Sequence, residues 1–147
     1  MYNDSRIDLY NYIYSLVYGK VTNNVYRMGE PTENTEDDTK NGFVVIEVGD
    51  ILDDSEFLCN AYGRARCMII AFIPKKSRGR LDIAKYKEYE SAINEVIREA
   101  ILSNDNETYS ILGDGVLSLD DDEQTQKGNQ YHLYIKSFIV EIDKDNN

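Results

Sequence analysis

The chain has 147 residues, of which 27 are acidic and 16 basic, so its formal net charge at pH 7 is −11. This charge argues against a general nucleic-acid-binding surface and against an anionic membrane, because both would repel a surplus of carboxylates. Charged residues make up 29% and hydrophobic residues 41%, which is typical of one folded domain and excludes a disordered chain. We therefore expect a single domain over residues 1–147.

The first predicted element is a helix that begins at Asp4 or Ser5 and runs to about Tyr18, with Gly19 ending it. Its apolar residues recur at three- and four-residue steps, which predicts one buried side. That side comprises Ile7, Tyr10, Ile13, Leu16 and Val17. A short strand or extended entry is expected over residues 22–28. The charges at Asp4, Arg6 and Asp8 are not those of a secretion signal.

An acidic stretch follows over residues 29–42, and its composition predicts a long exposed loop. Its carboxylates are Glu30, Glu33, Glu36, Asp37 and Asp38. We treat these five side chains as candidates to face a partner or a channel. The next run, FVVIEV at residues 43–48, predicts a strand because β-branched residues dominate it.

Residues 49–60 carry turn residues at both ends and apolar residues between them, so their structure stays open. Residues 64–73 are the most apolar run of the chain and predict a central strand buried on both faces, one of them covered by a second protein. Pro74 should end this strand. The basic, glycine-containing segment 75–80 then leads into the next helix.

Residues 82–102 predict a long amphipathic helix, with Asp82 as its N-cap. The apolar side repeats at helical spacing, and the opposite side is charged. The predicted buried residues are Ile83, Tyr86, Tyr89, Ile93, Val96, Ile97, Ala100 and Ile101. Such a stripe needs a matching surface, and the apolar strands on either side of the helix provide one.

The last third of the chain predicts two short strands, 109–112 and 116–119, hinged at Gly113-Asp114-Gly115. A second exposed acidic loop is expected over residues 120–130. Its candidate partner-facing or channel-facing carboxylates are Asp120, Asp121, Asp122 and Glu123. A final strand is predicted over residues 131–142, with a disordered tail at 143–147. The predicted fold class is therefore α+β: a mostly antiparallel sheet with an N-terminal helix and one long helix on one face.

No pattern in the chain predicts catalytic, cofactor-binding or metal-binding residues, and we expect a protein that is not an enzyme. Cys59 and Cys67 match no zinc or redox spacing, which favours free thiols in a reducing compartment over a disulfide between them. His132 is the only histidine and fits a surface or edge strand. A catalytic Cys67–His132 pair is the disfavoured alternative. The acidic clusters lack the ligand order of a calcium loop.

Six of the 16 basic residues fall between positions 64 and 80. One interpretation is a solvated loop. The other uses the contrast with the two acidic loops, since opposite charge patches allow copies of a protein to associate head to tail, and such contacts close into rings. The candidate subunit interface is formed by Lys75, Lys76, Arg78 and Arg80.

The order of elements resembles that of the tail-terminator, tail-completion and head–tail connector (neck) proteins of tailed bacteriophages. The matching elements are the N-terminal helix, the VYR strand entry, the acidic loop, the FVVIEV strand, the RCMIIAFIPK strand that runs into a long helix, and the closing YHLYIKSFIVEID strand. The resemblance covers residues 5–143 and depends on the order and spacing of elements, with no signature motif.

The resemblance implies a structural virion protein that needs no cofactor and forms a ring at the head–tail junction or tail end. Its partners would be copies of itself and the neighbouring connector or tail-tube proteins. DNA would only pass through a channel lined by carboxylates, and no membrane would be involved. Such a protein would be assembled in the host cytoplasm and reside in the virion. The alternative function is a small acidic binding module, monomeric or dimeric, that docks a basic protein partner.

Overall fold

The computed structural model describes residues 2–31, 33–53, 62–103, 106, 108–121 and 130–143. Its elements follow one another along the chain as α1 (Tyr2–Val17), β1 (Val25–Arg27), α2 (Glu36–Asn41), β2 (Phe43–Val48), β3 (Leu52–Asp53), β4 (Tyr62–Pro74), α3 (Ile83–Ser103), β5 (Tyr109–Asp121) and β6 (Tyr131–Asp143). A short 3-10 turn at Ser77–Gly79 lies between β4 and α3.

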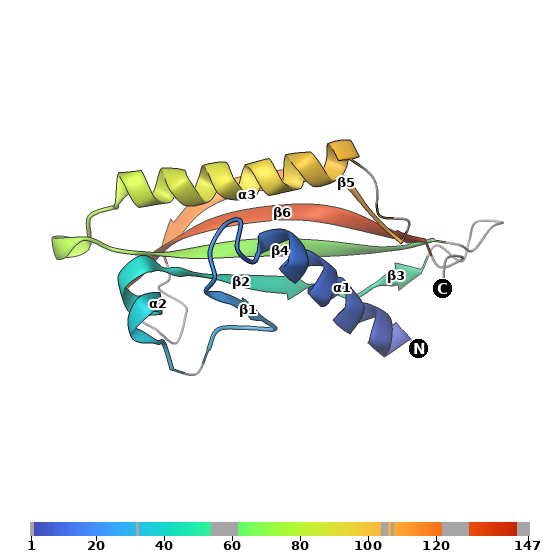
Figure 1. The fold of residues 1–147 in the computed structure, drawn as a ribbon, viewed down its shortest axis with the longest axis horizontal. Coiled ribbons are helices and arrows are strands. Elements are labelled where there is room, and N and C mark those ends of the chain that lie inside the picture. Colours follow the sequence, from blue (N-terminus) through green and yellow to red (C-terminus); the bar gives the residue numbers. More distant parts are fainter. Residues whose placement is uncertain are drawn as a thin grey trace.

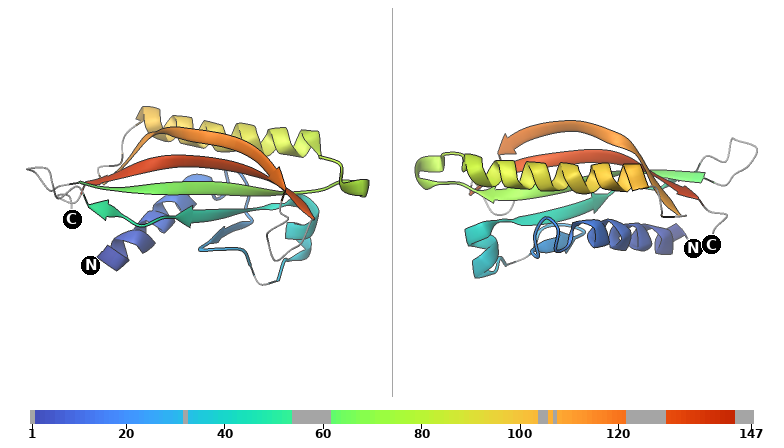
Figure 2. Two further views of the ribbon diagram at one scale, coloured as in Figure 1. Left: turned by 180° about the vertical axis from the view of Figure 1, so that it is seen from behind. Right: turned by 45° about the horizontal axis from the view of Figure 1, so that its top comes forward.

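The strands form one mixed sheet in the order β1-β2-β4-β6-β5, with β3 pairing to β4. β1 is parallel to β2, and the other pairs are antiparallel. Helices α1 and α3 lie on the same face of this sheet (Figures 1 and 2). The predicted α+β class, with an N-terminal helix and a long helix packed on a mostly antiparallel sheet, is confirmed.

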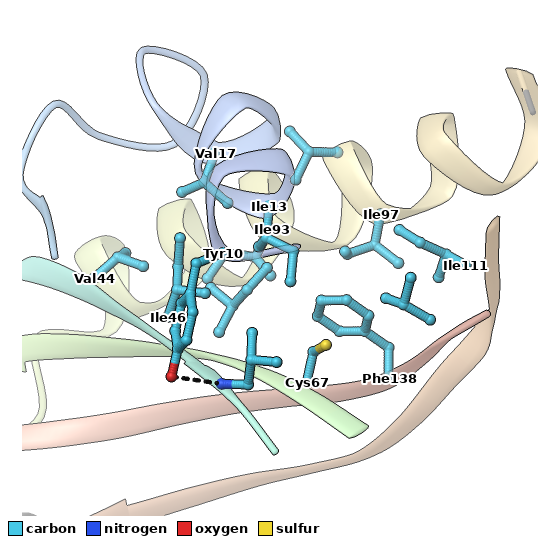
Figure 3. Packing of buried hydrophobic residues seen from close by; sticks show 14 of the residues in the cluster. Tyr10, Ile13, Val17, Val44, Ile46, Cys67, Ile93, Ile97, Ile111 and Phe138 are labelled. Atoms are coloured by element: carbon cyan, nitrogen blue, oxygen red, sulfur yellow. Dashed lines mark hydrogen bonds between the residues drawn. The ribbon is translucent and has the colours of Figure 1, made fainter. Parts of the chain in front are cut away.

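The main core lies between the sheet and the two helices (Figure 3). Alternate residues of β2, β4 and β6 point into it because side chains alternate between the faces of a strand. The fully buried strand residues of this face are Val44, Ile46, Cys67, Ile69, Ala71, Ile73, Tyr134 and Val140. The Tyr10 hydroxyl accepts a hydrogen bond from the Val48 backbone N–H at 3.1 Å, which joins α1 to β2.

The long helix was predicted almost to the residue. Asp82 Oδ1 accepts a hydrogen bond from the Lys85 backbone N–H at 3.1 Å, as expected of an N-cap. Tyr89, Ile93, Val96 and Ile97 are buried. The prediction was wrong for Ile83, which is 59% exposed.

The N-terminal helix shows the same kind of error. Ile7 was expected on the buried side but is 53% exposed, whereas Leu9 is fully buried. At about 100° per residue, Ile7 and Ile83 each lie roughly a quarter-turn from the middle of the buried arc of their helix. In both helices, a step of three or four residues from a core residue therefore led to a position at the border of the buried side and not to a buried one.

β5 replaces the two short hinged strands that the sequence predicted. It is one 13-residue strand whose register to β6 shifts between Ile111 and Gly113 and again between Asp114 and Leu117. The Gly113-Asp114-Gly115 segment therefore lies within a bulged strand. β5 occupies one outer edge of the sheet.

Two other expectations changed. Asp143 belongs to β6, and residues 144–147 of the expected tail lie outside the described residues. Of the undecided segment 49–60, Leu52–Asp53 forms β3, and residues 54–60 lie outside the described part of the chain.

Candidate assembly surfaces

The basic segment after β4 forms a closed turn that projects from one end of the molecule (Figure 1). The backbone N–H of Lys76 donates to the Arg80 carbonyl at 2.8 Å, and the N–H of Gly79 donates to the Lys76 carbonyl at 3.0 Å. Arg78 and Gly79 both have positive φ values, 63° and 72°. We call residues 75–80 the basic turn; its backbone is held from within, and its cationic side chains at 76, 78 and 80 are exposed.

These exposed side chains have no acidic partner among the residues that the structure describes. Within the residues that the structure describes, Lys76, Arg78 and Arg80 form no ion pair. Lys75 differs, because it is half-buried and its backbone N–H donates to the Gln130 carbonyl at 3.0 Å. The basic turn therefore presents fixed positive charge to whatever approaches this end of the molecule.

The predicted long acidic loop is partly a helix. Thr35 caps α2 in a capping box: its hydroxyl accepts from the Asp38 backbone N–H at 3.0 Å, and the Asp38 carboxylate accepts from the Thr35 backbone N–H at 3.1 Å. Glu33, Glu36 and Asp37 are exposed, as predicted. We call these three residues the acidic group.

Asp37 is the most constrained member of the acidic group. Its carboxylate accepts hydrogen bonds from the side-chain amides of Asn24 and Asn41. The bonds from Asn24 and then Asn41 hold the pKa of Asp37 below its ordinary value, so this carboxylate stays ionised.

Asp38 and Glu30 correct the prediction of an exposed loop. Asp38 is fully buried, and Glu30 is half-buried. The Tyr26 hydroxyl donates to Asp38, which ties α2 to β1. Burial, followed by this hydrogen bond and the Asp38 charge, raises the pKa of Tyr26 to about 12. Asp38 therefore cannot line a channel or meet a partner, and its role is structural.

The second acidic group begins at the end of β5. Asp120 and Asp121 are strand residues whose backbones pair with Leu133 and His132, whereas Asp122 and Glu123 lie outside the described residues. Because Pro74 pairs with Tyr131, this end of β5 lies at the same end of the sheet as the basic turn. α2 precedes β2 at that end as well, since Phe43 pairs with Phe72.

The basic turn, α2 and the end of β5 with Asp120 and Asp121 thus lie at one end of the molecule, away from the N-terminus (Figure 1), and we call it the charged end. They remain separated across the sheet, because α2 leads into β2 whereas the basic turn follows β4, the neighbouring strand. The sequence contained both charge patches but gave no indication that they share an end.

The sheet face opposite the helices is only partly covered. At the charged end, Phe43, Val45, Phe72 and Tyr131 form a second small core, and Asn34 donates to the Tyr131 hydroxyl at 2.6 Å. The middle of this face holds half-buried apolar side chains on β4 and β6. They are Met68, Ile70, Leu133, Ile135 and Ile139, and we call them the apolar strip.

Within this chain β4 is buried only on its helix-covered face, so burial of its other face by a second protein stays a prediction. The helix-covered face of β4 is buried throughout residues 65–73. On the other face only Phe72 is buried, Ile70 and Met68 are half-buried, and Arg66 and Arg64 are exposed. Arg64 forms an ion pair with Glu141 at 3.4 Å.

The alternative Cys67–His132 pair is not brought together. Cys67 is fully buried beside Phe138 (Figure 3), and burial raises the pKa of its thiol to about 12. His132 pairs with Ile73, six residues further along β4, which separates the two side chains by roughly 20 Å. Cys67 is a free thiol, and Cys59 lies outside the described residues.

Clefts border α3 on the side that faces α1, and sequence reasoning did not anticipate them. A cleft of about 530 Å³ is lined by Leu16, Val96, Ala100 and Leu102 among others, and one of about 230 Å³ lies beside Tyr109. Among the residues described, no group of three or more histidine, cysteine, aspartate or glutamate side chains is placed to hold a metal ion. No helix in that part of the chain is long and apolar enough to cross a membrane.

Searches against protein-family models and against curated protein sequences find no match to this chain.

Proposed function

We propose that this protein is a structural subunit of a ring at the head–tail junction or tail end of a tailed bacteriophage. The ring would terminate the tail or connect it to the head, and DNA would pass through its centre. The proposal begins from the resemblance in element order, and one observation supports it most. The basic turn and the acidic group lie at the same end of the molecule, next to the neighbouring strands β4 and β2.

This observation matters because of the symmetry of a ring. In a closed ring each copy contacts its neighbours through two different surfaces, so one patch meets a different patch on the next copy. In a ring whose axis runs along the strands, two patches meet only if they lie at the same end of the subunit, because patches at opposite ends lie at different heights. The basic turn and the acidic group satisfy this condition because they share an end and are displaced across the sheet.

The apolar strip offers a second contact. Met68, Ile70 and Ile135 are half-buried on the sheet face opposite α1 and α3. Apolar side chains in the centre of an interface, surrounded by polar residues, are typical of stable subunit contacts. We expect a neighbouring copy or an adjoining connector protein to cover this strip.

The channel proposal follows from the net charge of −11. A lumen that binds DNA phosphates would retain the DNA, whereas carboxylates repel it. Asp120 and Asp121, at the end of β5, are our candidates for the channel side. The acidic group near α2 then remains available for contacts between copies.

Imaging tests the proposal most directly. Phage particles or tails that contain this protein should show it as a ring density at the neck or tail end in cryo-electron microscopy. The purified protein should also form closed oligomers, alone or after addition of a neighbouring connector or tail component, as measured by sedimentation and negative-stain imaging.

A protein that is absent from particles and remains a monomer or dimer in every fraction would contradict the ring. If that same protein also bound a basic protein through the acidic group, the alternative function, an acidic binding module, would replace the ring.

A further inference from the structure

We propose that the basic turn of one copy docks against the acidic group of the next copy, with Arg78 and Arg80 meeting Glu33 and Glu36. This contact depends on the proposed ring and specifies which surfaces join its subunits. The partner is therefore a second copy of this chain, and its chemistry is that of carboxylates in and just before the capped first turn of α2.

The basic turn is built as a docking element. The hydrogen bonds Lys76 N–H to Arg80 and Gly79 N–H to Lys76 close its backbone, so little conformational entropy is lost when it is bound. Its exposed guanidinium groups suit carboxylates, because each presents several N–H donors in a planar fork.

The two members of the acidic group in α2, Glu36 and Asp37, are also held in place. Glu36 lies in the first turn of α2, which Thr35 and Asp38 cap, and Asp38 is anchored to Tyr26 in turn. The amides of Asn24 and Asn41 hold Asp37 in place. Glu33 and Glu36 are exposed and form no ion pair within the described residues. The basic turn and the acidic group thus share one end of the molecule. The ion pairs seen among the described residues, Arg6–Asp50, Arg64–Glu141 and Arg98–Glu95, do not link the two.

Charge complementarity also argues against nucleic acid as the occupant. A DNA strand lying on the basic turn would pass the carboxylates of α2 at the same end of the molecule, and these would repel its phosphates. At physiological salt, charges act over about 8 Å. A projecting turn that meets a compact acidic group on another protein avoids this repulsion.

A charge-exchange experiment on the full chain tests the contact. One variant carries Arg78→Glu with Arg80→Glu, and a second carries Glu33→Lys with Glu36→Lys. In each variant alone, like charges face one another in every contact, and ring assembly should be lost, with an apparent dissociation constant at least about tenfold higher. In an equal mixture, each altered turn meets an oppositely charged acidic group, and assembly should return.

A matched control carries Lys20→Glu with Lys87→Glu, which makes the same change in net charge at exposed positions outside the turn. It should assemble like the wild type. Circular dichroism and thermal unfolding of all variants verify the fold. Sedimentation and negative-stain imaging measure assembly at low and high salt, under conditions where the wild type forms rings.

The outcomes separate this contact from the ring itself. If Arg78→Glu with Arg80→Glu assembles like the wild type, or if the mixture of folded variants stays dissociated, the docking proposal is overturned while the ring stands. If the basic turn binds DNA with an affinity that Arg78→Glu with Arg80→Glu abolishes, and ring assembly is unchanged, nucleic acid is the partner. If the wild type forms no ring alone or with its neighbours, the proposed function fails and the contact fails with it.

Discussion

Asp38 joins two parts of the structure that the sequence separates. Its carboxylate is fully buried and accepts hydrogen bonds from Tyr26 and from the Thr35 backbone, so it fixes α2 against β1. We expect Asp38→Ala to lower the free energy of unfolding by about 2 kcal/mol, because it removes the acceptor of the Tyr26 hydroxyl and of the Thr35 backbone N–H, and with it half of a capping box. Urea denaturation measures this loss.

Glu36→Ala is the matched control for Asp38→Ala, since Glu36 is in the same helix but exposed. It should change stability by less than about 0.5 kcal/mol. Equal effects of the two substitutions would mean that Asp38 does not anchor α2.

Tyr26 gives this anchor a dependence on pH. Its pKa is raised from 10.0 to about 12 in the folded protein, so the folded state holds the phenolic proton more tightly than the unfolded state does. The stabilisation is therefore complete below pH 10 and is lost as the pH rises through about 12. Tyr26→Phe should be less stable than the wild type below pH 10, and the difference should shrink towards pH 12.

Comparing wild type with Tyr26→Phe removes the contribution of other groups. Burial also raises the pKa values of Tyr89 and Cys67 to about 12, but both groups are present in each protein and cancel in the difference. A difference in unfolding free energy that stays constant from neutral pH to pH 12 would refute the coupling between Tyr26 and Asp38.

The sequence contains a pattern that predicts the capping of α2 by Asp38, but the many acidic residues around it hide this pattern. Thr35 followed three residues later by Asp38 is the pattern of a capping box, yet the surrounding carboxylates made the whole stretch resemble a solvated loop. The capping-box spacing distinguishes Asp38 from Glu36 and Asp37, but the contact that buries it also depends on the position of Tyr26 on β1, which is a tertiary fact.

At the scale of elements, α3 allows one substitution to be tested at two positions. Ile93 is fully buried, whereas Ile83 is 59% exposed on the same helix. Ile93→Ala should cost about 3 kcal/mol because it removes buried methyl groups and leaves a cavity. Ile83→Ala should cost less than about 0.5 kcal/mol. Chemical denaturation of both variants tests the orientation of the helix, and similar losses would place the buried arc elsewhere.

Local patterns predicted those elements whose cause is local. The strand 43–48, the helix from Ile83 and its cap at Asp82 follow from β-branched runs, helical spacing and capping chemistry. The bulged β5 did not, because Gly113 and Gly115 signal a turn in sequence, and only the pairing with β6 extends one strand through them. The burial of Lys136, 2% exposed on the helix-covered face, also depends on strand register.

For the whole molecule, the charged end could not be foreseen. The segments at this end are α2, the basic turn, the end of β5 and the start of β6, which are distant in sequence. They meet only because β2, β4, β6 and β5 are neighbours in the sheet and alternate in direction. The sequence identified the charged residues but not their common location, and it contained no information on which strands would be neighbours.

The channel proposal yields a test at this scale. Asp120→Asn with Asp121→Asn should leave ring assembly unchanged and slow the passage of DNA, because the phosphates would be repelled less. DNA release from particles that carry the variant measures this effect. Loss of the ring instead would assign the end of β5 to the contact between subunits.

The two register shifts in β5 affect whether strands of other molecules can add to the edge of the sheet. A regular outer strand offers a template on which further strands add without limit, and that is how fibres form. An outer strand with irregular spacing of its backbone groups disfavours such addition. In the proposed ring, copies would then associate through side-chain contacts of fixed geometry and not by adding strands to β5, which permits an assembly of finite size.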